Sequence, residues 1–318
     1  MQTVILATDR GPGPLSSVAS TPMLPVADRP LVAHAADAAV TAGTEELVFV
    51  VGDDAPQVQS YFGGRYAGVP ATYAIQEDSH ERAIRALRGR LDGRVAVLNG
   101  SCLYDAGGVD ALFDHDAAIA AEPAEGPAPV GTDGGEPTVE RASGACVFPA
   151  DSLDSVTGGR PLSVAALESA ASRPAVVDVP RVAVSSAADL VDANARAMAS
   201  IAPAGETVQI ADDATVEQGV TFDGPVLIAG GATVERNATL RGPVVVGPNA
   251  TVGVRAVVDS AVLFGDATVD AGARLDGAVI GPNCTVGDGA SVAGVTDARG
   301  NGVAAIVTDG ARERLGYW

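Results

Sequence analysis

The chain has 318 residues, which at about 150 residues per domain suggests two domains and leaves ample chain for a large core. Its 40 aspartates and glutamates face 20 basic residues, all of them arginine, so the formal net charge is -20. Such a surface repels nucleic acid and anionic lipid, because binding phosphate needs clustered cations. Composition therefore argues against a nucleic-acid or membrane-surface function.

Residues 1–200 predict strands that alternate with helices. Residues 3–7 are β-branched or apolar and predict a first strand, which a loop rich in Gly, Pro and Ser follows. A helix is predicted over residues 30–42, because apolar residues recur there at steps of three and four, and Gly43 is well placed to end it. Further strands are predicted at residues 47–51, 69–75 and 95–98, and a last helix at 189–200.

Strands separated by helices indicate a mostly parallel α/β sheet with helices on its faces. In such sheets ligands bind beyond the carboxyl ends of the strands. The loops after Ala7 and Leu98 are therefore the expected site.

The second part of the chain is a repeat with a period of six. Aliphatic or aromatic residues recur every six positions at ten consecutive positions from Ile210 to Phe264, and the series then continues, with two five-residue steps, to Val292. A period of six fits neither a helix nor one long strand, but it fits a triangular solenoid with one short strand and one corner per hexad. The pattern resembles the hexapeptide-repeat left-handed parallel β-helix, with four to five coils.

The chain shows no targeting segment and no run near 18 apolar residues, so we expect a cytoplasmic protein that does not span a membrane. Cys102, Cys146 and Cys284 lie far apart and predict buried free thiols rather than disulfides or a metal site. The acidic, lysine-free composition resembles that of extreme halophiles, in which dense carboxylates maintain solubility at high salt. An ordinary acidic protein from a GC-rich genome is the alternative.

The N-terminal half is similar to the sugar-1-phosphate nucleotidyltransferases. The segments that carry this resemblance are the first strand and its glycine-rich loop, Thr21 to Val26 (TPMLPV), Leu98-Asn99-Gly100, residues 145–149 (ACVFP) and residues 189–194 (DLVDAN). The resemblance implies a Rossmann-like, GT-A-like sheet domain, to which a β-helix is often appended in this family. It also implies displacement at the α-phosphorus of a nucleoside triphosphate by a sugar 1-phosphate, with release of pyrophosphate.

At several positions where the resemblance implies a charged residue, this chain has a different one. The phosphate loop usually carries an Arg, whereas here it runs Asp9-Arg10-Gly11-Pro12-Gly13 with Gly13 in the Arg position. Asp9 brings a negative charge to a phosphate site, and Pro12 removes an amide donor. Thr21 replaces a Lys that normally neutralises the sugar phosphate.

Both metal carboxylates of the family are also replaced. Ser101 stands where the first Asp ligand would follow Leu98-Asn99-Gly100, and Ala183 stands at the second ligand position. Asp9 or Asp105 is a possible rescue ligand for magnesium, although a helix-capping or solvated role is the alternative for Asp105. Losing one preorganised electrostatic contact costs about 10²–10³ in rate, so losing four leaves little reason to expect turnover.

The resemblance implies a degenerate nucleotide pocket without catalytic or metal-binding residues. We expect its residues to be Leu6, Ala7, Gly11, Gly13, Gln76, Asn99 and Gly100.

The histidines argue against a second activity in the repeat. They are His34, His80 and His115, so the repeat has no imidazole of its own for acetyl transfer or a His₃ zinc site. His34 is expected to pack, and the other two to lie at the surface.

We therefore predict a non-catalytic regulatory or assembly subunit that binds a nucleotide or nucleotide sugar, in a homo-oligomer or paired with an active paralogue. One alternative is an active but divergent sugar-1-phosphate nucleotidyltransferase that uses magnesium, and another is a purely structural partner. The predicted domains are residues 1–200, the β-helix 201–295 and a C-terminal segment 296–318, which caps the solenoid or docks a partner.

Overall fold

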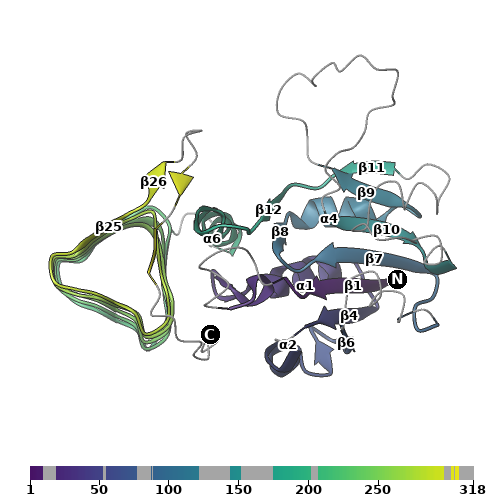
Figure 1. Ribbon diagram of the computed structural model, residues 1–318, viewed down its shortest axis with the longest axis horizontal. Coiled ribbons are helices and arrows are strands. Elements are labelled where there is room, and N and C mark those ends of the chain that lie inside the picture. Colours follow the sequence, from purple (N-terminus) through teal and green to yellow (C-terminus); the bar gives the residue numbers. More distant parts are fainter. Residues whose placement is uncertain are drawn as a thin grey trace, which may run out of the picture. The chain divides into compact units, whose positions relative to one another are not determined.

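The computed structural model describes residues 1–9, 19–52, 55–76, 87, 89–121, 144–151, 175–201, 207–296, 302–303 and 305–307. These residues fall into two compact units, and Figure 1 labels several of their elements. The first lies within Met1–Asp9 and Val32–Arg181, and the second within Arg10–Leu31 and Val182–Trp318.

The first unit is built on an eight-stranded, mostly parallel sheet with the order β11-β9-β10-β7-β1-β4-β6-β5. Strand β1 lies centrally and pairs in parallel with β4 and β7, and β4 pairs in parallel with β6. Only the pairings of β10 with its two neighbours and of β5 with β6 are antiparallel. The strands are β1 (Gln2–Ala7), β4 (Glu46–Val51), β5 (Arg65–Tyr66), β6 (Val69–Ile75), β7 (Arg94–Asn99), β9 (Ala118–Ala121), β10 (Ala145–Pro149) and β11 (Ala175–Asp178).

The predicted elements of this half agree with the structure to within two residues at each end. Continuous apolar runs become central strands because both faces of a mostly parallel sheet are buried. Helix α1 (Leu31–Thr41) ends before Gly43, whose φ of 84° is a left-handed conformation that suits glycine. Helices α2 (Ala55–Phe62) and α4 (Ala106–Phe113), with the short strands β8 (Cys102–Tyr104) and β12 (Arg181–Ala183), complete this part of the chain.

In the second unit, helix α6 (Ala187–Ile201) anchors the segment that carries η2 (Thr21–Met23), β2 (Pro25–Val26) and β3 (Arg29–Pro30). Asn194 on α6 is 1% exposed, and its Oδ1 accepts a hydrogen bond from the backbone N–H of Ala27 at 2.7 Å. Its Nδ2 donates to the carbonyl of Leu190 at 2.8 Å. This buried amide therefore has partners on both sides, as a buried polar group requires.

Residues 207–296, the hexad region, form three parallel ladders that stack coil on coil. Residues 17 or 18 apart pair across each ladder, as Val208 pairs with Val226 and Val262 with Val279. Seen end-on, the stack traces a triangle (Figure 1), an arrangement that fits a β-helix. Its strands are β13 (Val208–Ile210), β14 (Thr215–Val216), β15 (Thr221–Asp223), β16 (Val226–Ile228), β17 (Thr233–Val234), β18 (Thr239–Val246), β19 (Thr251–Val252), β20 (Val257–Leu263), β21 (Thr268–Val269), β22 (Arg274–Asp276), β23 (Ala278–Ile280), β24 (Thr285–Val286) and β25 (Ser291–Ala293).

One ladder of the hexad region is apolar on both faces. Val244 and Val246 of β18 belong to the core inside the triangle, and the alternation of a strand turns Val245 outward. Val245 is nevertheless buried, with only 1% of its surface exposed. Its ladder neighbours Val262 and Val279 are 1% and 0% exposed. Helix α6 contacts β18, β20 and β23, and this contact accounts for the burial of the outer face.

The expected position of Phe264 in the repeat was wrong by one residue. Leu263, not Phe264, pairs with Val246 and Ile280 and belongs to the inner core. The shortening lies at a corner: Gly242 and Pro243 separate the paired segments of β18, but only Ser260, with a φ of 49°, separates those of β20. The five-residue step therefore comes before Leu263 and not after Phe264.

Both ends of the repeat differ from its middle. Ile210, the first residue of the six-residue series, is 45% exposed, since it lies in the first strand of its ladder. Beyond residue 295, β28 (Ala305–Val307) pairs in parallel with β23, and β26 (Val295–Thr296) pairs with β27 (Gly302–Val303). The C-terminal segment beyond residue 307 lies outside the described residues. No helix among the described residues is long and apolar enough to cross a membrane.

Candidate functional site

The carboxyl ends of β1 and β7 meet at one edge of the sheet in the first unit. Leu6 pairs with Asn99, and the backbone N–H of Gly100 donates to the carbonyl of Leu6 at 2.8 Å. A Cβ on Gly100 would lie 2.8 Å from that carbonyl oxygen, so only glycine allows the two chains to approach this closely. The structure thus brings together the two loops at which the sequence predicts a site.

Asp9 and Ser101 meet at this edge. Ser101 is 6% exposed, and its hydroxyl donates a hydrogen bond of 3.0 Å to Oδ2 of Asp9. Asn99 fixes the turn, because its Oδ1 accepts from the backbone N–H of Ser101 at 2.8 Å. A carboxylate therefore lies beside Ser101, the position where the resemblance implies a carboxylate, but it follows the neighbouring strand β1.

A buried polar group from β8 lies next to this turn. The Tyr104 hydroxyl accepts from the backbone N–H of Asn99 at 3.0 Å, and burial raises the pKa of Tyr104 well above its ordinary value. Burial also raises the pKa of the Cys102 thiol, while the charge of Arg181 lowers it and that of Asp9 raises it slightly. The guanidinium of Arg181 and the carboxylate of Asp9 therefore both lie near the same thiol.

Gln76 follows β6 at the same edge, two strands away from β1. Its backbone N–H donates to the carbonyl of Val51 at 2.8 Å, which extends the β4–β6 pairing by one bond. Its Oε1 is buried, and among the described residues it has no hydrogen-bond partner. An acceptor in that state is suited to a donor from a ligand.

Near the two positions where the resemblance implies metal ligands, Asp105 and Asp189 bind groups at the starts of helices. Asp105 is the N-cap of α4, and its Oδ1 accepts from the backbone N–H of Gly108 at 2.9 Å, so the capping interpretation of Asp105 is confirmed. Near Ala183, which is exposed, Asp189 accepts from the backbone and hydroxyl of Ser185 at 2.9 and 2.8 Å at the start of α6.

These residues do not fit a magnesium site. Magnesium takes near-octahedral oxygen ligation with carboxylates. In the part of the chain that the structure describes, no three acidic, His or Cys residues gather in a way that could hold an ion. The Asp9 carboxylate and the Ser101 hydroxyl, which meet at the edge, bind each other.

Several predicted positions lie elsewhere or outside the described residues. Leu6 and Ala7 are buried at the end of β1, whereas Gly11 and Gly13 lie outside the described residues, as does His80. Thr21 is 3% exposed in η2 of the second unit. The three cysteines are free and buried, as expected, and His115 is exposed.

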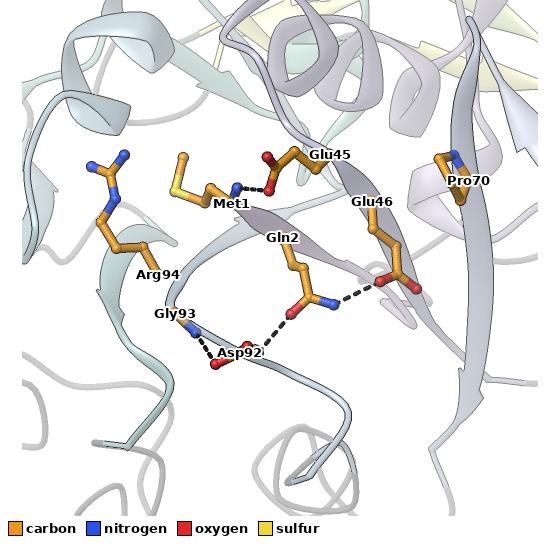
Figure 2. Close-up of a pocket in the computed structure, with 8 residues that line it drawn as sticks. All are labelled: Met1, Gln2, Glu45, Glu46, Pro70, Asp92, Gly93 and Arg94. Carbon is orange, nitrogen blue, oxygen red and sulfur yellow. Dashed lines mark hydrogen bonds and ion pairs between the residues drawn. The ribbon is translucent and has the colours of Figure 1, made fainter.

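A pocket of 630 Å³ opens at the opposite edge, beside the amino ends of β1, β4 and β7 (Figure 2). Its polar groups bind one another. The Gln2 amide donates to Glu46 at 2.6 Å and accepts from the backbone N–H of Asp92 at 2.8 Å, and the amino group of Met1 pairs with Glu45. That hydrogen bond lowers the pKa of Glu45. The pocket is therefore lined by internal pairs rather than by unsatisfied groups.

Sequence reasoning missed the roles of Tyr104, Cys102 and Arg181 at the carboxyl edge. No motif marks them, because Arg181 is about 80 residues distant in sequence from the other two. The sequence signal that could have indicated Cys102 and Tyr104 is their position directly after the Asn99-Gly100-Ser101 turn.

The chain therefore combines an α/β sheet that has polar groups at its carboxyl edge with a region of stacked parallel ladders. Known proteins are similar to parts of this chain. A family model described as the GMPPB C-terminal domain matches residues 222–308. The curated UTP--glucose-1-phosphate uridylyltransferase AglF of Haloferax volcanii is 30% identical over 110 residues, which are 33% of this chain and 45% of that protein.

A second curated relative is the CMP-5'-(3-aminopropyl)phosphonate synthase of Streptomyces rubellomurinus, 33% identical over 111 residues, which are 33% of this chain and 18% of that protein. The chain thus spans less than half the length of either relative. A solved structure of UDP-glucose pyrophosphorylase complexed with UDP-glucose matches 63% of this chain and 98% of its own length. The sequence identity is 16% and the TM-score is 0.49, so we draw no conclusion from this match. The two sequence matches and the family model support the resemblance to the sugar-1-phosphate nucleotidyltransferases seen in the sequence.

Proposed function

We propose that this chain is a non-catalytic subunit of nucleotide-sugar metabolism, with a nucleotidyltransferase-like fold and a degenerate pocket at the carboxyl edge of its sheet. The observation that supports the proposal is the donor set at that edge. Ser101 stands where the resemblance implies a carboxylate and binds Asp9, and the Asp105 carboxylate four residues later caps α4. In-line displacement at phosphorus depends on neutralising two phosphorylated anions, and these residues supply no metal cage for it.

The pocket we propose consists of Leu6, Ala7, Gly11, Gly13, Gln76, Asn99 and Gly100. Gln76 supports a retained ligand, because its buried Oε1 lacks a partner among the described residues and suits a donor such as a base N–H. By their names, one relative acts on UTP and glucose 1-phosphate, and the other makes a CMP conjugate. A pyrimidine nucleotide or nucleotide sugar is therefore the first ligand class to test.

We also propose the finer architecture. Residues 1–200 form a Rossmann-like, GT-A-like domain, residues 201–295 form a left-handed parallel β-helix, and residues 296–318 cap it. The 17- and 18-residue registers of the three ladders support the β-helix. Flat ladder faces suit association, so the partner is a second copy or an active paralogue.

The test is a turnover assay in molar KCl with magnesium, a panel of nucleoside triphosphates and a panel of sugar 1-phosphates. We expect no pyrophosphate from this chain, alongside binding of a nucleotide or nucleotide sugar by equilibrium dialysis. Magnesium-dependent turnover would instead establish the active, divergent enzyme. Absence of both turnover and binding from folded protein would leave the purely structural partner.

A further inference from the structure

We propose that Asp9 is a built-in anion that occupies the phosphate-accepting position at the carboxyl edge, so that removing its charge creates a tighter site for a nucleoside triphosphate. This inference rests on the proposed function and deepens it, because it names the residue that keeps phosphate binding weak. Its observations are the Asp9–Ser101 hydrogen bond, the position of both residues beyond parallel strands and the nearby guanidinium of Arg181.

The location is the first step. Asp9 lies two residues beyond β1, and Ser101 lies two residues beyond β7, the parallel neighbour of β1. Ligands of such sheets bind in this region, beyond the carboxyl ends of the strands. The Gly100 turn holds the two segments close, so the carboxylate lies inside this region rather than at an unrelated surface.

The donor is the second step. A phosphate oxygen at this edge needs hydroxyl, amide or guanidinium donors. The hydroxyl of Ser101 already donates to Oδ2 of Asp9 at 3.0 Å, and the backbone N–H of Ser101 donates to Asn99 at 2.8 Å. The side chain of Asp9 thus takes a donor that a bound anion would otherwise use.

Charge is the third step. A carboxylate facing a polyanion repels it, and the repulsion between neighbouring unit charges is large enough to change a binding constant about tenfold. The cation that would attract the ligand is present, since Arg181 and Asp9 both act on the Cys102 thiol. Replacing Asp9 by a neutral side chain would leave the charge of Arg181 unopposed by that carboxylate.

The experiment measures binding of UTP to the full chain by equilibrium dialysis in EDTA, at 0.1 M and at 2 M KCl. For Asp9→Asn we expect about tenfold tighter binding than wild type at 0.1 M, and a smaller gain at 2 M, where the Debye length falls below about 3 Å. The matched control is Asp110→Asn, which removes the same charge from an exposed position on α4 and should leave binding unchanged.

A second variant separates charge from hydrogen bonding. Ser101→Ala keeps the carboxylate and removes its hydroxyl partner, so it should not gain affinity for UTP. If Asp9→Asn fails to fold by circular dichroism, Asp9→Ser replaces it in the same comparison. The inference is overturned if the neutral variant binds UTP no more tightly than wild type, or if Asp110→Asn gains as much.

A magnesium arm tests the opposite role. Repeating the titration with Mg²⁺ should preserve the advantage of Asp9→Asn. If Mg²⁺ instead strengthens UTP binding to wild type and the variant loses this effect, Asp9 is a metal ligand and the inference is wrong. The proposed function fails by a separate readout, since it is contradicted by pyrophosphate release from wild type whatever the affinity of the variant.

Discussion

Cys146 lies in the middle of the sheet of the first unit, where it pairs with Val97 and Ile119 on the neighbouring strands. Burial raises the pKa of its thiol to about 12 from an ordinary value of 9.0. The folded state therefore retains a proton that the unfolded state loses above pH 9. The contribution of this thiol to the free energy of unfolding is therefore fully present below pH 9 and is lost as pH rises toward 12.

We predict that the free energy of unfolding of wild type falls more steeply between pH 9 and pH 11 than that of Cys146→Ala. Urea titrations at pH 7, 9, 10 and 11 measure the two slopes, and comparing slopes removes the constant cost of the cavity left by the substitution. The absence of lysine simplifies the comparison, because no ammonium side chains titrate in this range. Parallel curves would show that the thiol titrates alike in both states.

Residue roles at the site were predictable only where a local rule applies. Asp is a residue type favoured at helix N-caps, and the capping role of Asp105 was one of two interpretations that the sequence allowed. The Asp9–Ser101 bond joins residues 92 positions apart, so it depends on strand order, which spacing along the chain does not give. For the same reason Arg181 carried no signal in the sequence.

Helix α4 tests the assignment of Asp105 at the scale of an element. Its carboxylate satisfies the backbone N–H of Gly108, one of the donors that a helix start leaves without a partner. We predict that Asp105→Ala lowers the free energy of unfolding by about 1 kcal/mol and that Asp105→Ser, which retains a capping oxygen, restores most of it.

Chemical denaturation of the Asp105 variants measures these losses, with the exposed Asp110→Asn as the charge-matched control. Isothermal titration with Mg²⁺ on the same proteins checks the rescue-ligand alternative. A stability loss without any change in Mg²⁺ binding supports the cap. Loss of a magnesium response in Asp105→Ala would contradict it.

The hexad region offers a matched pair of valines in one strand. Val262 is 1% exposed on the outer face that α6 covers, whereas Val257 at the other end of β20 is partly exposed. We predict that Val262→Asp lowers the free energy of unfolding by about 3–5 kcal/mol, because it buries a charge without a partner. Val257→Asp should cost about 1 kcal/mol.

Thermal and urea unfolding of the two variants measure this contrast. Similar losses in both would show that α6 does not seal this ladder. The sequence predicted the strands of the repeat but not the packing of α6 on this ladder. A run such as Val244-Val245-Val246 shows that both faces are apolar, but it does not show which element packs on the outer face. The sequence also placed Phe264 instead of Leu263 in the repeat series, because a corner one residue shorter leaves the apolar pattern ambiguous by one position.

The whole molecule combines a strongly acidic composition with a sheet edge at which we propose that a degenerate nucleotide pocket lies. A net charge of -20 disfavours binding of any polyanion at low salt, and molar salt screens that field to within about 3 Å. Local groups at the carboxyl edge then decide whether a nucleotide binds and reacts. Of these, Asp9 and Ser101 are the pair that carries our proposal.

A single-turnover assay tests the central claim most directly. Full-length protein in excess over γ-labelled UTP is incubated with glucose 1-phosphate in 2 M KCl, with magnesium or with EDTA, and labelled pyrophosphate is counted. The Haloferax volcanii uridylyltransferase serves as the positive control. We predict that pyrophosphate formation with magnesium stays at the EDTA blank. Magnesium-dependent formation that disappears in Asp9→Ala would contradict the account and make Asp9 the ligand of an active, divergent enzyme.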